Sequence, residues 1–190
     1  IEMSSCTFLN WGEKLVEEGV LDEALIDEAV ERILELKAKL GLFENPFRFA
    51  DVEKEKEIIL CKEHRELARK VAVQSLVLLK NDDNVLPLDA AGKKIALIGP
   101  FGDSKHILGG WSCEGREEEA VSIKEGLEYL MPTISLHVAK GCDIEEGTDE
   151  EISKAVEIAR KCDVIIAALG EHAGMSGEAG CRAFLTLPGR

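Results

Sequence analysis

Hydrophobic and polar positions divide the chain into a helical first part and a second part in which strands and helices alternate. In the first part, residues 22–40 carry Ile26, Val30 and Ile33 on one helical face, with acidic side chains early and lysines late. Gly41 can close this helix in the left-handed conformation. The pattern therefore predicts an amphipathic helix that needs a partner for its apolar side.

A second long helix is predicted for residues 64–80, where two adjacent apolar stripes indicate a largely buried element. Residues 44–62, between the two helices, are polar and include the charged run EKEKE at 53–57. This stretch predicts an irregular connector and a domain boundary.

Strand and helix patterns alternate after residue 92. Short apolar strands are predicted at 95–98, 134–138 and 164–169, the last as a buried parallel strand. Capping boxes at 122–125 and 148–151 open the helices between them. This order predicts right-handed crossovers and a parallel sheet with helices on both faces. Because the chain stops where the next helix would be expected, we expect the sheet to be incomplete.

Composition excludes several classes of partner. The chain has 37 acidic and 23 basic residues, a formal net charge of −14, which argues against nucleic acid and against an anionic membrane surface. No apolar run is long enough for a transmembrane helix. The first residue is Ile1 rather than Met, so we expect the chain to be a piece of a longer polypeptide.

The six cysteines show no CxxC pair, which excludes zinc-knuckle and thioredoxin-type motifs. Their irregular spacing favours free thiols in a reducing compartment, and hence a cytoplasmic location. The turn at 99–102 lacks the dinucleotide fingerprint, and the sequence has neither a P-loop nor a nucleophile elbow. Asp103 and His106 alone do not make a metal site. We therefore predict no cofactor and no metal.

Candidate chemistry gathers on a glycine-rich loop that directly follows the strand at 164–169. This loop contains Glu171, Glu178 and Arg182. Ligands of open α/β sheets bind beyond the carboxyl ends of strands, although spacing alone favours an ordinary charged surface loop. Glu178 could give and take a proton, but one carboxylate does not make a hydrolase.

Trp111 is the other candidate binding residue. It lies in the sequence Gly-Gly-Trp-Ser at 109–112, on a loop that follows the first strand. A tryptophan flanked by small residues can offer its flat face to a sugar ring. An aromatic side chain that closes the end of the sheet is an equally good interpretation.

The ordered series of motifs resembles glycoside hydrolase family 3, the β-glucosidases and β-xylosidases of that group. The similarity covers essentially the whole chain and rests on segments at 26–34, 41–43, 64–81, 86–88, 98–101, 109–112, 139–142, 170–182 and 187–189. It implies that residues 1–46 are the C-terminal remnant of a (β/α)8-type barrel and that 47–63 are a linker. Residues 64–190 would then be an incomplete C-terminal α/β sandwich.

The resemblance also implies a chemistry. It implies a retaining mechanism, in which an aspartate from the barrel is the nucleophile and a glutamate from a loop of the C-terminal domain is the acid/base. By motif Glu178 matches the acid/base and Glu171 is the alternative, while Trp111, Ser112 and Arg182 would contact substrate. We expect the parent protein to hydrolyse terminal β-linked sugars from oligosaccharides or glycosides, and the fragment alone to be inactive.

Two further expectations concern partners. The missing barrel domain is the partner that the resemblance implies, and without it the apolar face of residues 22–40 should pack on the sandwich or drive homo-oligomer formation. The alternative function, from another class, is a carbohydrate-binding or interaction module without catalysis.

Overall fold

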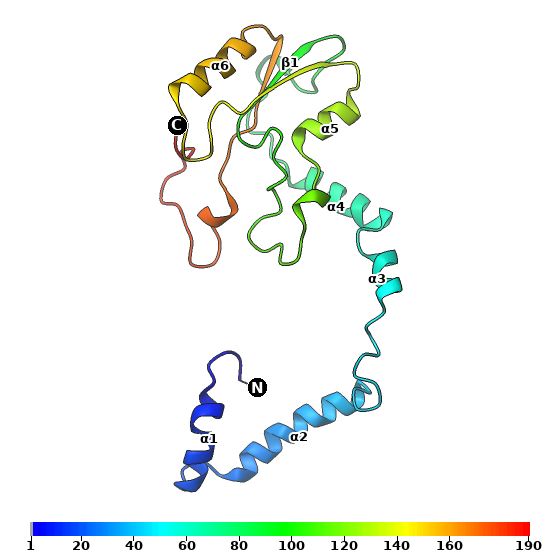
Figure 1. The fold of residues 1–190 in the computed structure, drawn as a ribbon, viewed down its shortest axis with the longest axis vertical. Coiled ribbons are helices and arrows are strands. Elements are labelled where there is room, and N and C mark those ends of the chain that lie inside the picture. Colours follow the sequence, from blue (N-terminus) through cyan, green and yellow to red (C-terminus); the bar gives the residue numbers. More distant parts are fainter. Residues whose placement is uncertain (1) are drawn as a thin grey trace. The chain divides into compact units, whose positions relative to one another are not determined.

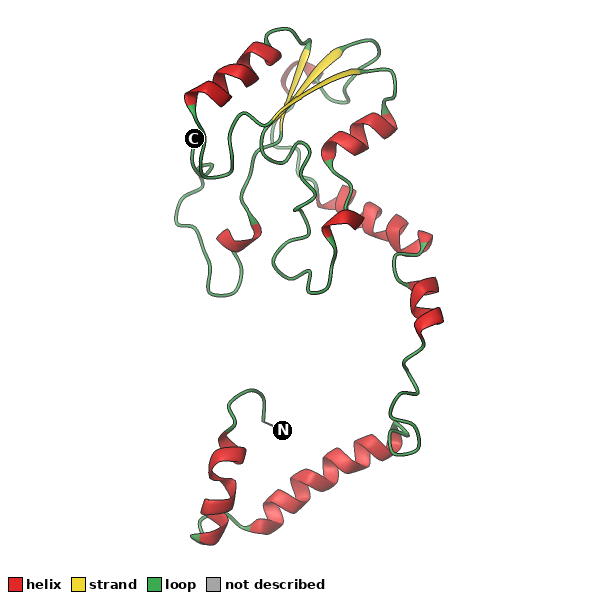
Figure 2. Ribbon diagram, in the orientation of Figure 1, coloured by secondary structure: helices red, strands yellow, loops and turns green. Residues whose placement is uncertain are grey.

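The computed structural model describes residues 2–190. The chain divides into two compact units, Ile1–Leu78 and Leu79–Arg190. The first unit is helical and the second contains a small parallel sheet with flanking helices (Figures 1 and 2). The predicted α/β class is confirmed, whereas the domain boundaries inferred from the sequence stay predictions. The elements are α1 (Thr7–Glu17), α2 (Glu23–Lys39), α3 (Val52–Ile58), α4 (Lys62–Ser75), β1 (Lys94–Ile98), α5 (Ile123–Leu130), β2 (Ser135–Ala139), α6 (Asp149–Ala159) and β3 (Val164–Ala167), with 3₁₀ turns at Asp82–Asn84, Glu117–Glu119 and Ala173–Met175.

In the first unit, α2 forms where its periodicity predicts. Asp22 caps it by accepting a hydrogen bond from the Ala24 amide at 3.0 Å, and Gly41 follows it with a φ of 66°. The side chains of α2 remain at least partly exposed along its whole length. Together with α1 it lines an apolar groove of about 720 Å³. None of the described helices is both long enough and apolar enough to cross a membrane.

The helix predicted at 64–80 differs from the observed α4 in extent and in burial. α4 ends at Ser75, where the hydroxyl donates to the Ala72 carbonyl at 2.8 Å and Leu76 turns to extended backbone with ψ of 133°. The prediction that this helix is largely buried is wrong for the described chain, in which α4 has no buried residue. Within the described residues its apolar stripes therefore remain exposed.

The sheet of the second unit has the order β2-β1-β3, and both pairings are parallel. The chain reaches β2 through α5 and then crosses to the opposite edge through α6. Right-handed crossovers that run in opposite directions place their helices on opposite faces, and Figure 1 shows α5 and α6 on opposite sides of the sheet. α6 packs against β1 and β2.

Burial in this sheet is concentrated on its central strand. Ile95, Ala96 and Leu97 of β1 are fully buried, because strands flank β1 on both sides and helices cover its faces. The sequence predicts β3 as the buried strand, and this is wrong in part. Ile165 is 57% exposed, because β3 is an edge of the described sheet and one of its faces is open.

Both predicted capping boxes are present. At the start of α5 the Ser122 hydroxyl accepts from the Glu125 amide at 3.1 Å, and the Glu125 carboxylate accepts from the Ser122 amide at 2.9 Å. Thr148 and Glu151 repeat this arrangement at the start of α6. Ser122 is only 2% exposed, so its cap is part of the packed interior.

We predict that Ser122→Ala lowers the free energy of unfolding by about 1 kcal/mol, because an N-cap oxygen and one buried hydrogen bond are lost. Urea unfolding of the chain measures this loss. Ser153→Ala is the matched control, since it makes the same chemical change at an exposed position inside α6 and should leave the midpoint nearly unchanged. Equal effects of the two substitutions would contradict this role for the cap.

Candidate functional site

Two loops leave the carboxyl edge of the sheet side by side. The β1 loop comprises residues 99–122 and the β3 loop comprises residues 168–190; they follow the two adjacent strands β1 and β3. In the order β2-β1-β3 the first crossover leads to one side of β1 and the second leads to the other side, so the crevice beyond β1 and β3 is a topological switch point. Open α/β sheets bind ligands at such points.

The bases of the two loops are in close contact. The Phe101 amide donates to the Ala168 carbonyl at 3.2 Å. Gly99 has a φ of 116°, and a Cβ atom at this position would lie 2.3 Å from the same carbonyl oxygen. Only glycine fits this backbone conformation and this approach. The packing of Gly99 on Ala168 therefore sets the spacing between the loops.

The loops meet again near their tips. A Cβ atom on Gly177 would lie 3.7 Å from the indole Nε1 of Trp111, and one on Gly110 would lie 3.6 Å from the Ala173 carbonyl oxygen. Trp111 is 72% exposed. The structure therefore brings the predicted aromatic residue beside the turn that carries Glu178, and it leaves most of the ring open to a ligand.

Glu178 lies at the tip of a two-residue turn. The Gly177 amide donates to the Gly180 carbonyl at 3.1 Å and the Gly180 amide returns a bond at 3.2 Å. Ala179 follows Glu178 with a φ of 58°, a value that type II turns require at this position. Glu178 is exposed, so its carboxylate can face a ligand or a second protein surface.

The other candidates of the β3 loop are joined to one another. Arg182 Nη1 donates to Glu171 Oε1 at 2.6 Å, and Nη2 donates to the Thr186 carbonyl at 2.9 Å. Ser112 is half-buried in the β1 loop, where its carbonyl accepts from the Gly115 amide at 2.8 Å. Sequence patterns did not indicate the Arg182 contacts, because they depend on how the loop folds back.

Charged side chains hold the base of the β1 loop. Lys124 Nζ donates to Asp103 Oδ2 at 2.9 Å, and this hydrogen bond raises the pKa of Lys124. Lys105 Nζ lies 2.8 Å from Glu125 Oε1, and the Lys105 hydrogen bond lowers the pKa of Glu125, helped by the backbone amide of Ser122. The loop that carries Trp111 is thus tied to the first turn of α5.

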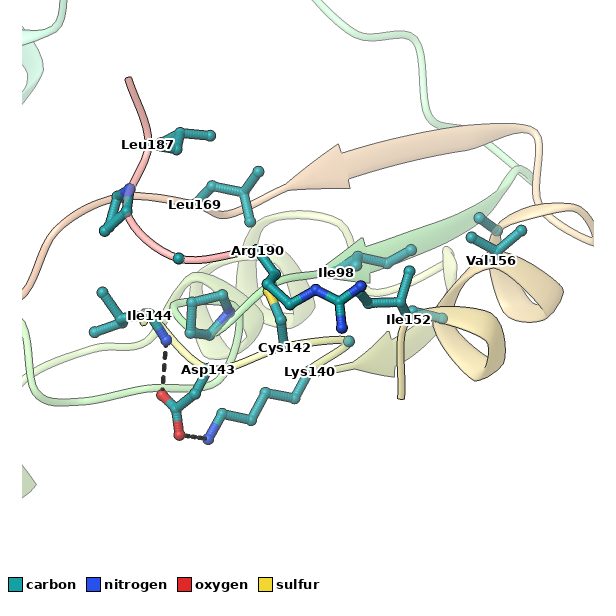
Figure 3. A pocket seen from close by; sticks show the side chains of 18 residues that line it. Ile98, Lys140, Cys142, Asp143, Ile144, Ile152, Val156, Leu169, Leu187 and Arg190 are labelled. Atoms are coloured by element: carbon teal, nitrogen blue, oxygen red, sulfur yellow. Dashed lines mark hydrogen bonds and ion pairs between the residues drawn. The ribbon is translucent and has the colours of Figure 1, made fainter. Parts of the chain in front are cut away.

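A cavity of about 320 Å³ lies nearby, beyond the carboxyl ends of β1 and β2 and against α6 (Figure 3). Its walls are mainly apolar. Lys140 Nζ donates to Asp143 Oδ2 at 2.6 Å, which lowers the pKa of Asp143, and Arg190 Nη2 lies 2.5 Å from Asp149 Oδ1. None of the five predicted site residues lines this cavity, and its charged groups are already paired. It is therefore a poorer place for a polyhydroxylated ligand than the loop tips.

Metal binding has little support from the described side chains. Across residues 2–190, no group of three or more histidine, cysteine, aspartate or glutamate side chains is arranged to hold a metal ion.

Comparisons with known proteins agree with one another. The family model described as the Glycosyl hydrolase family 3 C-terminal domain matches residues 76–190. A β-xylosidase of Formosa agariphila is 36% identical over 173 residues, covering 86% of this chain and 23% of that protein. The periplasmic β-glucosidase of Salmonella typhimurium is 31% identical over 199 residues, covering 92% and 26%.

A solved structure is similar over nearly the whole chain. The β-glucosidase from Listeria innocua in complex with glucose is 39% identical, with a TM-score of 0.84, and the match covers 99% of this chain and 25% of that one. The chain therefore spans about a quarter of the length of these relatives.

The contact between Gly177 and Trp111 gives a direct test of the site geometry. Gly177 has a φ of 124°, so we predict that Gly177→Ala moves the turn, at a cost of about 1–3 kcal/mol in local strain. In a Trp11→Phe background, where Trp111 is the single tryptophan, its fluorescence maximum should shift. Ala179→Gly, whose φ suits glycine, is the control and should leave the emission unchanged. Identical spectra for all three proteins would contradict the observed contact.

The stabilising effect of Glu125 at the base of the β1 loop should be lost in acid. Because the pKa of Glu125 is lowered in the folded chain, its stabilising effect is present above its ordinary value of 4.5 and is lost as pH falls through the lower folded value. We expect the difference in urea midpoint between the wild type and Glu125→Gln to shrink over that range. Lys105→Met, which removes the main cause of the lowered pKa, should weaken the dependence. A constant difference below the ordinary glutamate range would contradict the assignment.

Proposed function

Because the chain belongs to glycosyl hydrolase family 3, we propose that it forms part of a retaining β-glycosidase, of the β-glucosidase type, that removes terminal β-linked sugars from oligosaccharides or glycosides. The observation that carries this proposal is the exposed carboxylate of Glu178 on a tight turn beside Trp111. Glu178 is the acid/base, and the indole face of Trp111 stacks on a sugar ring. Ser112, which follows Trp111 directly, completes the binding side of the β1 loop.

Glu178 is a better acid/base than Glu171. The Glu171 carboxylate is engaged by the Arg182 guanidinium at 2.6 Å within the loop, so it is less free to reach the oxygen of a leaving group. The Glu178 side chain, in contrast, is exposed and has no hydrogen-bond or ion-pair partner among the described residues. In a retaining mechanism the acid protonates the leaving oxygen and then, as a base, activates water.

The nucleophile in this proposal comes from the barrel domain that the family resemblance implies. Retention requires the two carboxyl groups to lie about 5–5.5 Å apart, so that a glycosyl-enzyme can form and then be hydrolysed. This separation can be reached only when the barrel covers the loop tips. The 190-residue chain alone should therefore not turn over substrate.

Partners and location follow from the same reasoning. The apolar groove of α1 and α2 is the surface that we assign to the barrel, and in its absence to self-association. Nucleic acid is a poor partner for a chain with a net charge of −14.

Among residues 2–190 all six cysteines have free thiols. We infer a cytoplasmic location from them, although one relative is named for the periplasm.

The second candidate function is a carbohydrate-binding module without catalysis, which the 72% exposure of Trp111 favours. Calorimetry of the 190-residue chain with glucose and short β-glucans separates the two functions. Binding that Trp111→Ala abolishes would support the module. An absence of binding, together with an active full-length enzyme, would support the half-site.

We predict that Glu178→Ala in the full-length protein lowers kcat/KM for phenyl β-glucoside by about 10²- to 10⁴-fold, the usual contribution of general acid catalysis. The activated 2,4-dinitrophenyl glucoside should lose far less in the glycosylation step, because its leaving group needs no proton. Azide should restore turnover and yield a β-glycosyl azide.

Two matched substitutions control this experiment. Glu157→Ala changes an exposed glutamate on α6 and should keep wild-type kinetics. Glu171→Ala should show no azide rescue. If Glu178→Ala keeps wild-type kcat/KM on both substrates, or if azide rescues only Glu171→Ala, Glu178 is not the acid/base.

A further inference from the structure

The guanidinium of Arg182 joins two distant parts of the β3 loop. Arg182 binds the Glu171 carboxylate at the start of the loop and the Thr186 carbonyl near its end, at 2.6 Å and 2.9 Å. The Arg182 side chain is only 23% exposed, whereas Glu178 lies at the exposed tip of the same loop. The half-buried guanidinium of Arg182 therefore closes the segment that carries the turn.

The Glu178 carboxylate does not fix its own position. In the described part of the chain, none of the hydrogen bonds or ion pairs involves its side chain. Its location therefore depends on the backbone of the turn, and the turn depends on the closed segment below it. A loop held at both ends samples far fewer conformations than one that is free.

We propose that Arg182 is a positioning residue for the acid/base: it closes the β3 loop through Glu171 and Thr186 and so holds the Glu178 turn at a fixed height above the sheet. This inference rests on the proposed function. It gives Arg182 a different role from the sugar contact that the sequence suggested, because two of its donors are already used within the loop.

The geometry requires an arginine. The planar guanidinium donates from two nitrogens in fixed directions, which allows it to reach a carboxylate and a carbonyl at the same time. A lysine at this position would be a point charge on a flexible stem. It could keep the Glu171 pair but would hold the Thr186 carbonyl poorly.

The test uses the full-length protein and compares Arg182→Met and Arg182→Lys with the wild type on two substrates. A small displacement of a catalytic group costs up to about 10²-fold in rate. We expect Arg182→Met to lower kcat/KM for phenyl β-glucoside by about 10- to 100-fold, and to change glycosylation by 2,4-dinitrophenyl glucoside less than threefold. Arg182→Lys should recover part of the loss. Activity on the dinitrophenyl substrate also reports that the variants are folded.

A double-mutant cycle separates positioning from a general structural role. In a Glu178→Ala background, Arg182→Met should cost no further activity on phenyl β-glucoside, because the group that it positions is absent. Arg190→Met is the matched control, since it removes an arginine–carboxylate pair in the same unit away from the turn, and it should keep both activities.

The outcomes distinguish this inference from the proposed function. The positioning role is overturned if Arg182→Met lowers kcat/KM equally for both substrates or for neither of them. It is also overturned if Arg182→Met has its full effect on kcat/KM in the Glu178→Ala background. If Glu178→Ala itself shows no dependence on the leaving group, the acid/base assignment fails first, whatever Arg182 does.

Discussion

The contact between Gly99 and the Ala168 carbonyl is the constraint on which the site depends. It joins the first residue after β1 to the first residue after β3, where a side chain would meet the carbonyl oxygen at 2.3 Å. The two loops therefore start from one rigid point on the central strand, whose side chains Ile95 and Leu97 are fully buried. Packed strands place loop bases accurately, which is why the tips can meet again at Trp111 and Gly177 without a strand between them.

Local sequence signals predicted the sheet and its helices well, and the family resemblance is confirmed. The capping boxes at Ser122 and Thr148 depend on two residues three positions apart, so the sequence alone contains the whole interaction. The parallel order follows from alternating strands and helices, because right-handed crossovers leave few alternatives. Trp111 and Glu178 were recognised as candidates because small residues and glycines surround them.

The remaining features depend on contacts that periodicity does not encode. Apolar stripes predicted burial for α4, but such a stripe indicates only that a helix can be buried on that side. In the described chain α4 has no buried residue. Ile165 has the residue type of a buried strand, but its position at the edge of the described sheet decides its exposure. The Arg182 bridge could not be predicted, since an arginine among charged residues has many partners until the loop closes. The roles proposed for the site residues stay predictions.

The two units differ in what stabilises them, and this difference bears on function. The sheet unit has its own core around β1, and two ion pairs tie its loops: Lys105 with Glu125, and Arg182 with Glu171. These contacts lie within the sheet unit, so the loops are ordered without a partner, which suits the acid/base role proposed for Glu178. In the helical unit Gly12 is the one buried residue within the described helices. An apolar surface of this kind gains stability only by association. In the function that we propose, the rigid unit supplies one half of the active site, and the open apolar surface binds the domain that carries the other half.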